Sequence, residues 1–343
     1  MNIFKENESP EELGEFGLID RIMGMFEPKN DHDFTGLGDD CAVIRNASGR
    51  SLLITTDIML EEGHFRREWI SAEDLGYKSL AANLSDISAM GGSPHYALLS
   101  IGLPPDTSPD WLNDFFSGAN QLCESHGVNL IGGNTTKSGS IIINYTALGF
   151  INDENILWRS AAKLGDKIGL IGKVGESGAG LRLLQEAYDK EKPNHKHLIK
   201  AHNRPTLLIN EAKFLADTGS VHAMIDLSDG IQSDAGHITK QSGVTFSINA
   251  DRLPLSKQLF EVCDKYSWSA EEIALTAGED YSLLFTFDSK KEDFLKRRFR
   301  ELFPETVFSV IGDVKEGDAE VLFFKGNEKL ELHKQGFDQF KSK

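Results

Sequence analysis

The sequence has few cysteines, and none of them has the spacing that a cysteine-based site needs. Cys41, Cys123 and Cys263 are the three cysteines among 343 residues. An odd number without a CxxC pair predicts neither a disulfide framework nor a zinc site. A reducing compartment, the cytoplasm, is therefore the expected location.

The sequence also lacks an excess of basic residues. Its 36 Lys and Arg are outnumbered by 53 Asp and Glu, so the formal net charge is −17. Such a charge repels nucleic acid and anionic membrane surfaces, and neither is expected as a partner. There is no apolar run near the ~20 residues that a membrane-spanning helix needs. The N-terminus lacks the basic and apolar order of a signal peptide.

Several common nucleotide-binding and catalytic signatures are missing as well. Gly172-Lys173 is followed by Val174, so it is not a P-loop. The Gly36–Gly38 pair precedes a strand-like segment rather than a helix, which excludes a dinucleotide fingerprint. No Ser-His-Asp or Cys-His grouping supports covalent catalysis, and no covalent catalytic residue is expected. Two glycine-rich segments, 132–136 and 175–180, remain as candidate phosphate cradles or as ordinary turns.

The remaining pattern alternates between strands and helices. Residues 51–56 read as a buried strand that ends at Asp57, and Ser71 caps a helix that stops at the Gly91-Gly92 pair. Further strands are predicted over 95–103 and 140–150, with a helix over about 109–126 between them. After a polar turn at 152–155 the pattern starts again, with a strand over 167–172, helices over 181–188 and 231–243, and a strand within 273–287. We therefore predict a mixed α/β and α+β protein with domains at 1–150 and 151–343.

Carboxylates recur at the ends of these elements, next to Gly, Ser or Thr. They are Asp39, Asp40, Asp57, Asp86, Asp226, Asp229, Glu279 and Asp280. Each alone is typical of a turn or a helix cap. Gathered together, such hard oxygen ligands suit Mg²⁺ with substrate phosphates. A short echo between NLSD at 83–86 and DLSD at 226–229 suggests two related halves.

Taken in order, the motifs resemble those of the thiamine-monophosphate kinase family. That family lies in the superfamily of aminoimidazole ribonucleotide synthetase and selenophosphate synthetase. The matching strings are GLGDDCAVI (36–44), TTDIMLEEGHF (55–65), NLSDISAMGGSP (83–94), GGNTTKS (132–138), WRSAAKLGD (158–166), DLSDGIQSDAGHI (226–238), GEDYSLLFT (278–286) and GFDQF (336–340).

The resemblance implies an ATP-dependent kinase, a phosphotransferase with a phosphate group as acceptor. It would convert thiamine monophosphate to thiamine diphosphate by direct in-line transfer, assisted by several Mg²⁺ ions. The implied fold has two domains. The N-terminal domain would bind ATP and Mg²⁺ and pair into a homodimer, and the C-terminal α/β domain would complete the nucleotide and substrate site.

The resemblance also implies roles for individual residues. Metal ligands would be Asp40, Thr55, Thr56, Asp57, Asp86, Asn134, Asp226 and Asp229. ATP would contact Gly133, Asn134, Arg159 and Ser228, and the substrate would contact His64, Glu279 and Phe337. Phe337 could stack on a flat cationic ring.

Two positions depart from the family pattern. Asn134 stands where the family has Asp, which removes a charge from a metal site, and Phe337 stands where Trp or Tyr is common. Two alternatives therefore stay open. One is another ATP-dependent enzyme of the same superfamily, and the other is a nucleotide- or metal-binding regulator without turnover.

Overall fold

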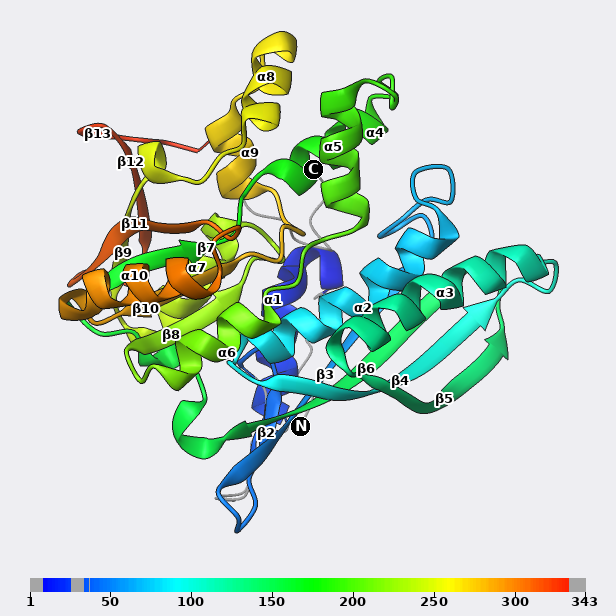
Figure 1. The fold of residues 1–343 in the computed structure, drawn as a ribbon, viewed down its shortest axis with the longest axis horizontal. Helices are drawn as coiled ribbons and strands as arrows, with labels where there is room; N and C mark the ends of the chain where they lie inside the picture. The colour runs from blue at the N-terminus through cyan, green and yellow to red at the C-terminus, as the bar shows by residue number, and fades with distance from the viewer. Residues whose placement is uncertain (1–8, 26–33, 37, 333–343) are drawn as a thin grey trace.

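The computed structural model describes residues 9–25, 34–36 and 38–332, and their strands form two sheets (Figure 1). The first is six-stranded in the order β1-β2-β3-β6-β4-β5, and the second is seven-stranded in the order β13-β12-β9-β11-β7-β10-β8. Helices accompany both sheets, so the predicted mixed fold of two units is observed.

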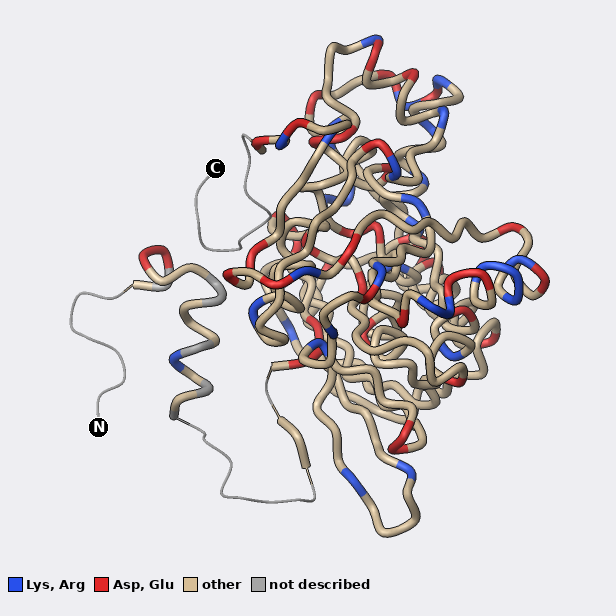
Figure 2. Tube along the Cα trace, turned by 90° about the vertical axis from the view of Figure 1, so that its left-hand side faces the viewer, with Lys and Arg blue, Asp and Glu red and all other residues tan. Residues whose placement is uncertain are grey.

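The N-terminal unit has its sheet covered by helices on one face. Its elements are α1 (Pro10–Met25), β1 (Phe34–Thr35), β2 (Ala42–Ile44), β3 (Arg50–Leu60), α2 (Ala72–Ala89), β4 (Ser93–Leu103), α3 (Pro109–His126), β5 (Asn129–Lys137) and β6 (Ile142–Asn152). Helices α2 and α3 pack together on the sheet, and α1 lies to one side, outside both sheets (Figure 2). Alternate residues of β6 are buried, so the helices cover a single face.

The other face of this sheet is open and largely apolar. Ile58, Leu60 and Tyr96 are exposed there, and the whole of edge strand β5 is exposed, including Leu130 and Ile131. Exposed apolar residues gathered on one face are typical of interaction surfaces.

The C-terminal unit has helices on both faces of its sheet. Its elements are β7 (Lys167–Ile171), α4 (Glu176–Gln185), α5 (Pro193–Asn203), α6 (Ile209–Asp217), β8 (Val221–Asp226), α7 (Ile231–Ser242), β9 (Thr245–Asn249), α8 (Lys257–Tyr266), α9 (Ala270–Thr276), β10 (Leu283–Phe287), α10 (Glu292–Leu302), β11 (Phe308–Lys315), β12 (Val321–Lys325) and β13 (Glu328–Lys329). Helix α7 packs on one face, and α6 and α10 on the other. Helices α4, α5 and α8 form a further cluster with its own core.

The two units meet along α2. The core of the N-terminal unit includes Leu207, Ile209 and Tyr281 from the C-terminal half. Helix α2 also contacts α6 and β8. Because α2 is wedged between the units, most of its surface is buried, including polar side chains such as Asn83. Functional groups from both halves can therefore meet beside it.

Local signals predicted α2, α3 and α7 correctly, whereas the helix expected over 181–188 begins and ends earlier, because α4 spans Glu176–Gln185. Ser71 caps α2 by accepting a hydrogen bond from the Asp74 N–H, and α3 and α7 begin and end as expected. The predicted glycine-rich turn at 132–136 is wrong, because these residues lie inside strand β5. No helix in the described ranges is both long and apolar enough to cross a bilayer.

Candidate active site

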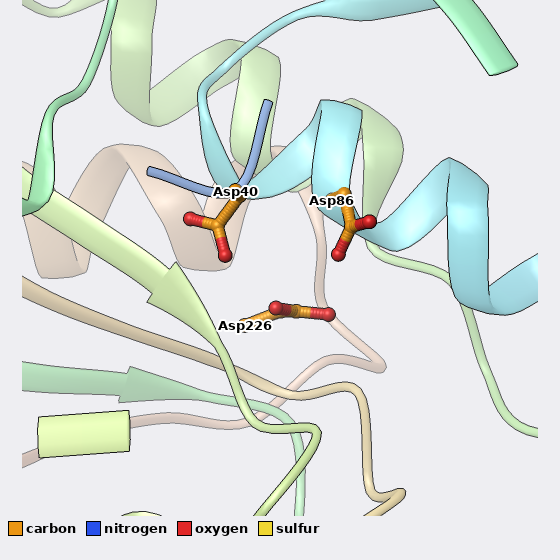
Figure 3. A group of neighbouring side chains, drawn as sticks. All are labelled: Asp40, Asp86 and Asp226. Atoms are coloured by element: carbon orange, nitrogen blue, oxygen red, sulfur yellow. The ribbon is translucent and has the colours of Figure 1, made fainter. Parts of the chain in front are cut away.

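Three carboxylates from distant parts of the chain converge where the two units meet. Asp40 precedes β2, Asp86 lies in the last turns of α2, and Asp226 ends β8. One oxygen from each lies within 4.8 Å of the others, and the side chains point toward a common centre (Figure 3). The structure thus brings together three of the predicted metal ligands.

Neighbouring hydroxyl and amide groups orient these carboxylates. The Thr55 hydroxyl donates to Asp86 Oδ2 at 2.5 Å, and the Ser85 hydroxyl donates to Asp226 Oδ2 at 2.5 Å. The Asp57 N–H donates to Asn83 Oδ1 at 3.0 Å, which attaches the end of β3 to α2. The side chains of the cluster are therefore held in place by the protein itself.

Burial and the repulsion between neighbouring carboxylates favour binding of a cation by the cluster. Burial raises the pKa of Asp226 to about 7, and the nearby charge of Asp40 adds to the effect. Burial and the charges of Asp57 and Asp226 raise the pKa of Asp86 well above its ordinary value. A divalent cation would offset both causes, because it compensates the buried charge and favours the ionised form.

Arg159 lies beside this cluster and pairs with its acids. Its guanidinium donates to both carboxylate oxygens of Asp40, and its backbone N–H donates to Asp39 Oδ2 at 3.1 Å. Burial, reinforced by the charge of Asp40, raises the pKa of Asp39 to about 7. The predicted ATP contact is thus placed within reach of the predicted metal site.

Not every predicted ligand reaches the cluster. The Thr56 side chain points to the open face of the sheet, where it donates to the Tyr145 carbonyl and accepts from Asn144 Nδ2. Asp229 lies in the loop before α7, and its N–H donates to the buried Asp234 at 3.2 Å. The oxygens that meet within 4.8 Å belong to neither residue.

Gly133 and Asn134 lie on β5, at the far edge of the N-terminal sheet. Three strand spacings separate β5 from β3, which is about 14 Å. Gly133 has φ +148°, and a Cβ there would lie 1.7 Å from the Leu99 carbonyl oxygen, so only glycine fits. Asn134 pairs with the exposed Ser100 and shares the open face with it. One chain does not bring these two residues to Asp40, Asp86 and Asp226.

A second group forms around the loop before β10. Gly278 packs against Ser228, with room for no side chain, since a Cβ would lie 2.0 Å from the Ser228 carbonyl oxygen. The Glu279 N–H donates to the same oxygen at 2.8 Å. The charge of His64 contributes to lowering the pKa of Glu279, so these two predicted substrate contacts lie near each other. Phe337, the third, lies outside the described residues.

Asp280 occupies the position where the sequence suggested a phosphate. Its two carboxylate oxygens accept hydrogen bonds from the N–H groups of Gly175 at 2.6 Å and Ser177 at 3.0 Å. These donors belong to the glycine-rich segment 175–180 at the N-terminus of α4. An internal carboxylate thus uses two of the donors that the phosphate-cradle interpretation of this segment needs, which favours a structural role for them.

Sequence reasoning missed several groups around the site. Ser85, Lys78 and His202 were not singled out as functional, although all three are buried and polar. The only available signal was their position. Ser85 precedes Asp86, and Lys78 interrupts the apolar positions of α2.

Comparison with known proteins agrees with this arrangement. Residues 38–151 match the family AIR synthase related protein, N-terminal domain, and residues 163–325 match its C-terminal domain. A thiamine-monophosphate kinase from Aquifex aeolicus is 38% identical over 307 residues, 90% of this chain and 93% of that protein. One from Haemophilus influenzae is 36% identical, covering 96% and 98% of the two chains. A solved structure, AaThiL complexed with AMPPCP and TMP, superposes with a TM-score of 0.85 at 36% identity, covering 97% and 99%.

Proposed function

The chain belongs to the thiamine-monophosphate kinase family of AIR synthase related proteins, and we propose that its three-carboxylate cluster holds Mg²⁺ during catalysis. Its reaction is the ATP-dependent phosphorylation of thiamine monophosphate to thiamine diphosphate. The observation that carries the proposal is the meeting of Asp40, Asp86 and Asp226 within 4.8 Å.

The residues present fit Mg²⁺. The cluster offers only carboxylate oxygens, which this ion prefers, and three protein ligands leave the remaining positions of an octahedral ion for phosphate and water. Asp57 and Thr55 stand beside it, and Asp229 would join through a further ion. When bound, Mg²⁺ neutralises negative charge on the phosphates of the two substrates.

The protein's own task is to position two anions that repel each other. The second pKa of a phosphate monoester is about 6, so the acceptor oxygen is already ionised at neutral pH and needs no general base. We propose that Arg159 and Ser228 of one chain contact ATP and that Gly133 reaches it from a second copy of the chain. His64, Glu279 and Phe337 then hold the thiamine half, and the transfer occurs in line. No covalent intermediate on the chain is needed.

The test is ADP release by the purified chain with ATP and Mg²⁺, measured with and without thiamine monophosphate. We expect ADP only when the acceptor is present, together with equal amounts of thiamine diphosphate. ADP release at the same rate with and without thiamine monophosphate would instead indicate a different ATP-dependent enzyme. ATP binding without turnover would indicate a regulator.

We also propose that the active form is a homodimer built on the open face of the N-terminal sheet. The exposed apolar residues on that face and the unpaired edge of β5 support this. The dimer and the metal role of Asn134 go together, because one chain keeps β5 about 14 Å from β3. A second copy is the route by which Asn134 would reach a metal site.

The departure at Asn134 leads to a prediction about Mg²⁺. One unit-charge interaction at ~4 Å with an effective dielectric of ~20 is roughly 4 kcal/mol before desolvation. Most of this is lost to desolvation and carboxylate repulsion, and a net effect on the order of 1–2 kcal/mol is about tenfold in affinity. Asn134→Asp is therefore expected to lower the Mg²⁺ concentration for half-maximal turnover about tenfold.

A Mg²⁺ titration at fixed ATP and thiamine monophosphate measures this. The matched control is Asn129→Asp, which adds the same charge at the start of the same exposed strand. An unchanged or raised midpoint in Asn134→Asp would show that position 134 does not ligate metal.

The two halves would then divide the work. We propose that residues 1–150 bind ATP and Mg²⁺ and form the dimer, and that residues 151–343 complete the nucleotide and substrate site. The free thiols of Cys41, Cys123 and Cys263 are consistent with a reducing cytoplasm.

A further inference from the structure

Lys78 is a fully buried lysine that lies outside the carboxylate cluster. It sits on α2 with 2% of its surface exposed, between the two units. Its ammonium lies 3.2 Å from Glu279 Oε1 and 3.3 Å from His202 Nε2. Lysine is almost never fully buried unless it is paired, so a lysine kept here points to a specific partner.

His202, on α5, completes the surroundings of this lysine. Burial and the charge of Lys78 lower its pKa to about 3, so the ring is neutral and has one acceptor nitrogen. Because Nε2 faces an ammonium, Nε2 is the acceptor and Nδ1 carries the proton. Nδ1 lies 3.1 Å from the Ser177 hydroxyl and 3.3 Å from Glu279 Oε2. The Glu279 carboxylate thus faces a donor on each oxygen.

Glu279 reaches outward from this buried pair. Its side chain is 28% exposed, whereas that of Lys78 is 2% exposed, so part of the Glu279 side chain stays accessible while both of its carboxylate oxygens face donors. Its backbone has φ +63°, a conformation that residues other than glycine rarely adopt. Burial would raise the pKa of Glu279, but the charge and the hydrogen bond of Lys78 act against burial and the pKa lies below its ordinary value, so the carboxylate is ionised.

We propose that Lys78 is a positioning residue that aims the Glu279 carboxylate at the cationic thiamine half of the acceptor. This rests on the proposed role of Glu279 as a substrate contact. Lys78 belongs to the N-terminal unit, whereas Glu279 and His202 belong to the C-terminal unit. The ion pair therefore fixes the acceptor contact of one unit relative to the helix that carries Asp86 in the other.

The first test is Lys78→Met, which keeps the length and removes the ammonium. We expect KM for thiamine monophosphate to rise at least tenfold, with KM for ATP and the Mg²⁺ midpoint within twofold of the wild type. Lys78→Arg retains the charge and should recover part of the loss. The control is Lys173→Met, which removes a half-exposed lysine 3.9 Å from Glu176 and should change none of these values.

A second test removes both charges, in case Lys78→Met leaves Glu279 too poorly compensated to fold. If Lys78 acts through Glu279, then in a Glu279→Gln background Lys78→Met should change the acceptor KM by less than twofold. Additive effects of the two substitutions would overturn the proposal, as would an equal rise in KM for ATP. If the wild type makes no thiamine diphosphate, the proposed function fails. If it does, and Lys78→Met has a normal acceptor KM, only this inference fails.

Discussion

Asp226→Asn is expected to lower kcat by roughly 10²–10³-fold without weakening the fold. A metal ion contributes several kcal/mol of transition-state charge stabilisation. Losing about 3–4 kcal/mol of it corresponds to that factor, at 1.36 kcal/mol for each tenfold. Asp226 supplies one of the three carboxylate oxygens that meet within 4.8 Å. The side-chain amide of the substituted Asn keeps an oxygen that can accept the hydrogen bond from the Ser85 hydroxyl.

The same substitution, Asp226→Asn, should lower kcat but keep or raise the stability of the metal-free protein. The folded-state pKa of Asp226 is raised to about 7 by burial and by Asp40. Above the pKa that Asp226 has in the unfolded chain, its ionisation therefore lowers the free energy of unfolding. This destabilisation grows with pH and is complete above about pH 7. In EDTA at pH 8, the thermal midpoint of Asp226→Asn should equal or exceed that of the wild type. Each 1 kcal/mol corresponds to about 2–4 °C in a domain of this size.

Steady-state kinetics and thermal melting in EDTA measure the two effects. Asp313→Asn is the control, because Asp313 pairs with Lys167 on the surface and should leave kcat unchanged. Near-normal turnover of Asp226→Asn at saturating Mg²⁺ would contradict the metal role of the cluster.

Gly278→Ala is expected to lower kcat/KM for thiamine monophosphate by roughly 10²-fold, because a displacement near 1 Å has about this effect. The added Cβ would lie 2.0 Å from the Ser228 carbonyl oxygen and 3.0 Å from the Asp229 Cα. The loop must move away from Ser228, and the Glu279 carboxylate moves with it. Overpacking of this kind also destabilises the fold by about 1–3 kcal/mol.

Kinetics with each substrate and urea unfolding check this result. Gly236→Ala is the matched control, because Gly236 lies inside α7 and a Cβ there meets no atom within 4 Å. That substitution should raise stability by up to about 1 kcal/mol and leave the kinetics unchanged. Normal acceptor kinetics in Gly278→Ala would show that the close packing on Ser228 does not position Glu279.

Elements with local start and stop signals could be predicted from the sequence. Helix α2 begins after a serine whose side chain caps it, and α3 has Pro109 at its start and Gly127 in the left-handed conformation at its end. Strand β5 was missed, because Gly132-Gly133 is typical of a turn. The glycine at position 133 is needed because the backbone of Leu99 on the neighbouring strand approaches too closely for a side chain. This contact is distant in sequence, so nothing in the neighbouring residues indicates it.

The site was predictable where a side chain follows an apolar strand, and less so where the contact is distant. Asp226 ends a buried strand, and it lies in the cluster. Thr55 and Thr56 are neighbours in the predicted ligand set, but side chains alternate along a strand, so Thr55 donates to Asp86 while Thr56 donates to the Tyr145 carbonyl on the opposite face. Asp280 caps a helix more than 100 residues earlier in the chain, so its role could not be predicted from neighbouring residues.

The order of strands in the N-terminal sheet has a consequence for synthesis of the chain. Strand β6 lies between β3 and β4, and its partners on β3 run from Arg50 to Leu60, each more than 80 residues earlier. Bringing β6 to β3 across so long a segment is slow, because the chain loses conformational entropy before the hydrogen bonds between the two strands form. We therefore expect a nascent chain released before Asn152 to expose two unjoined pieces of sheet, and to need a holding chaperone until β6 emerges.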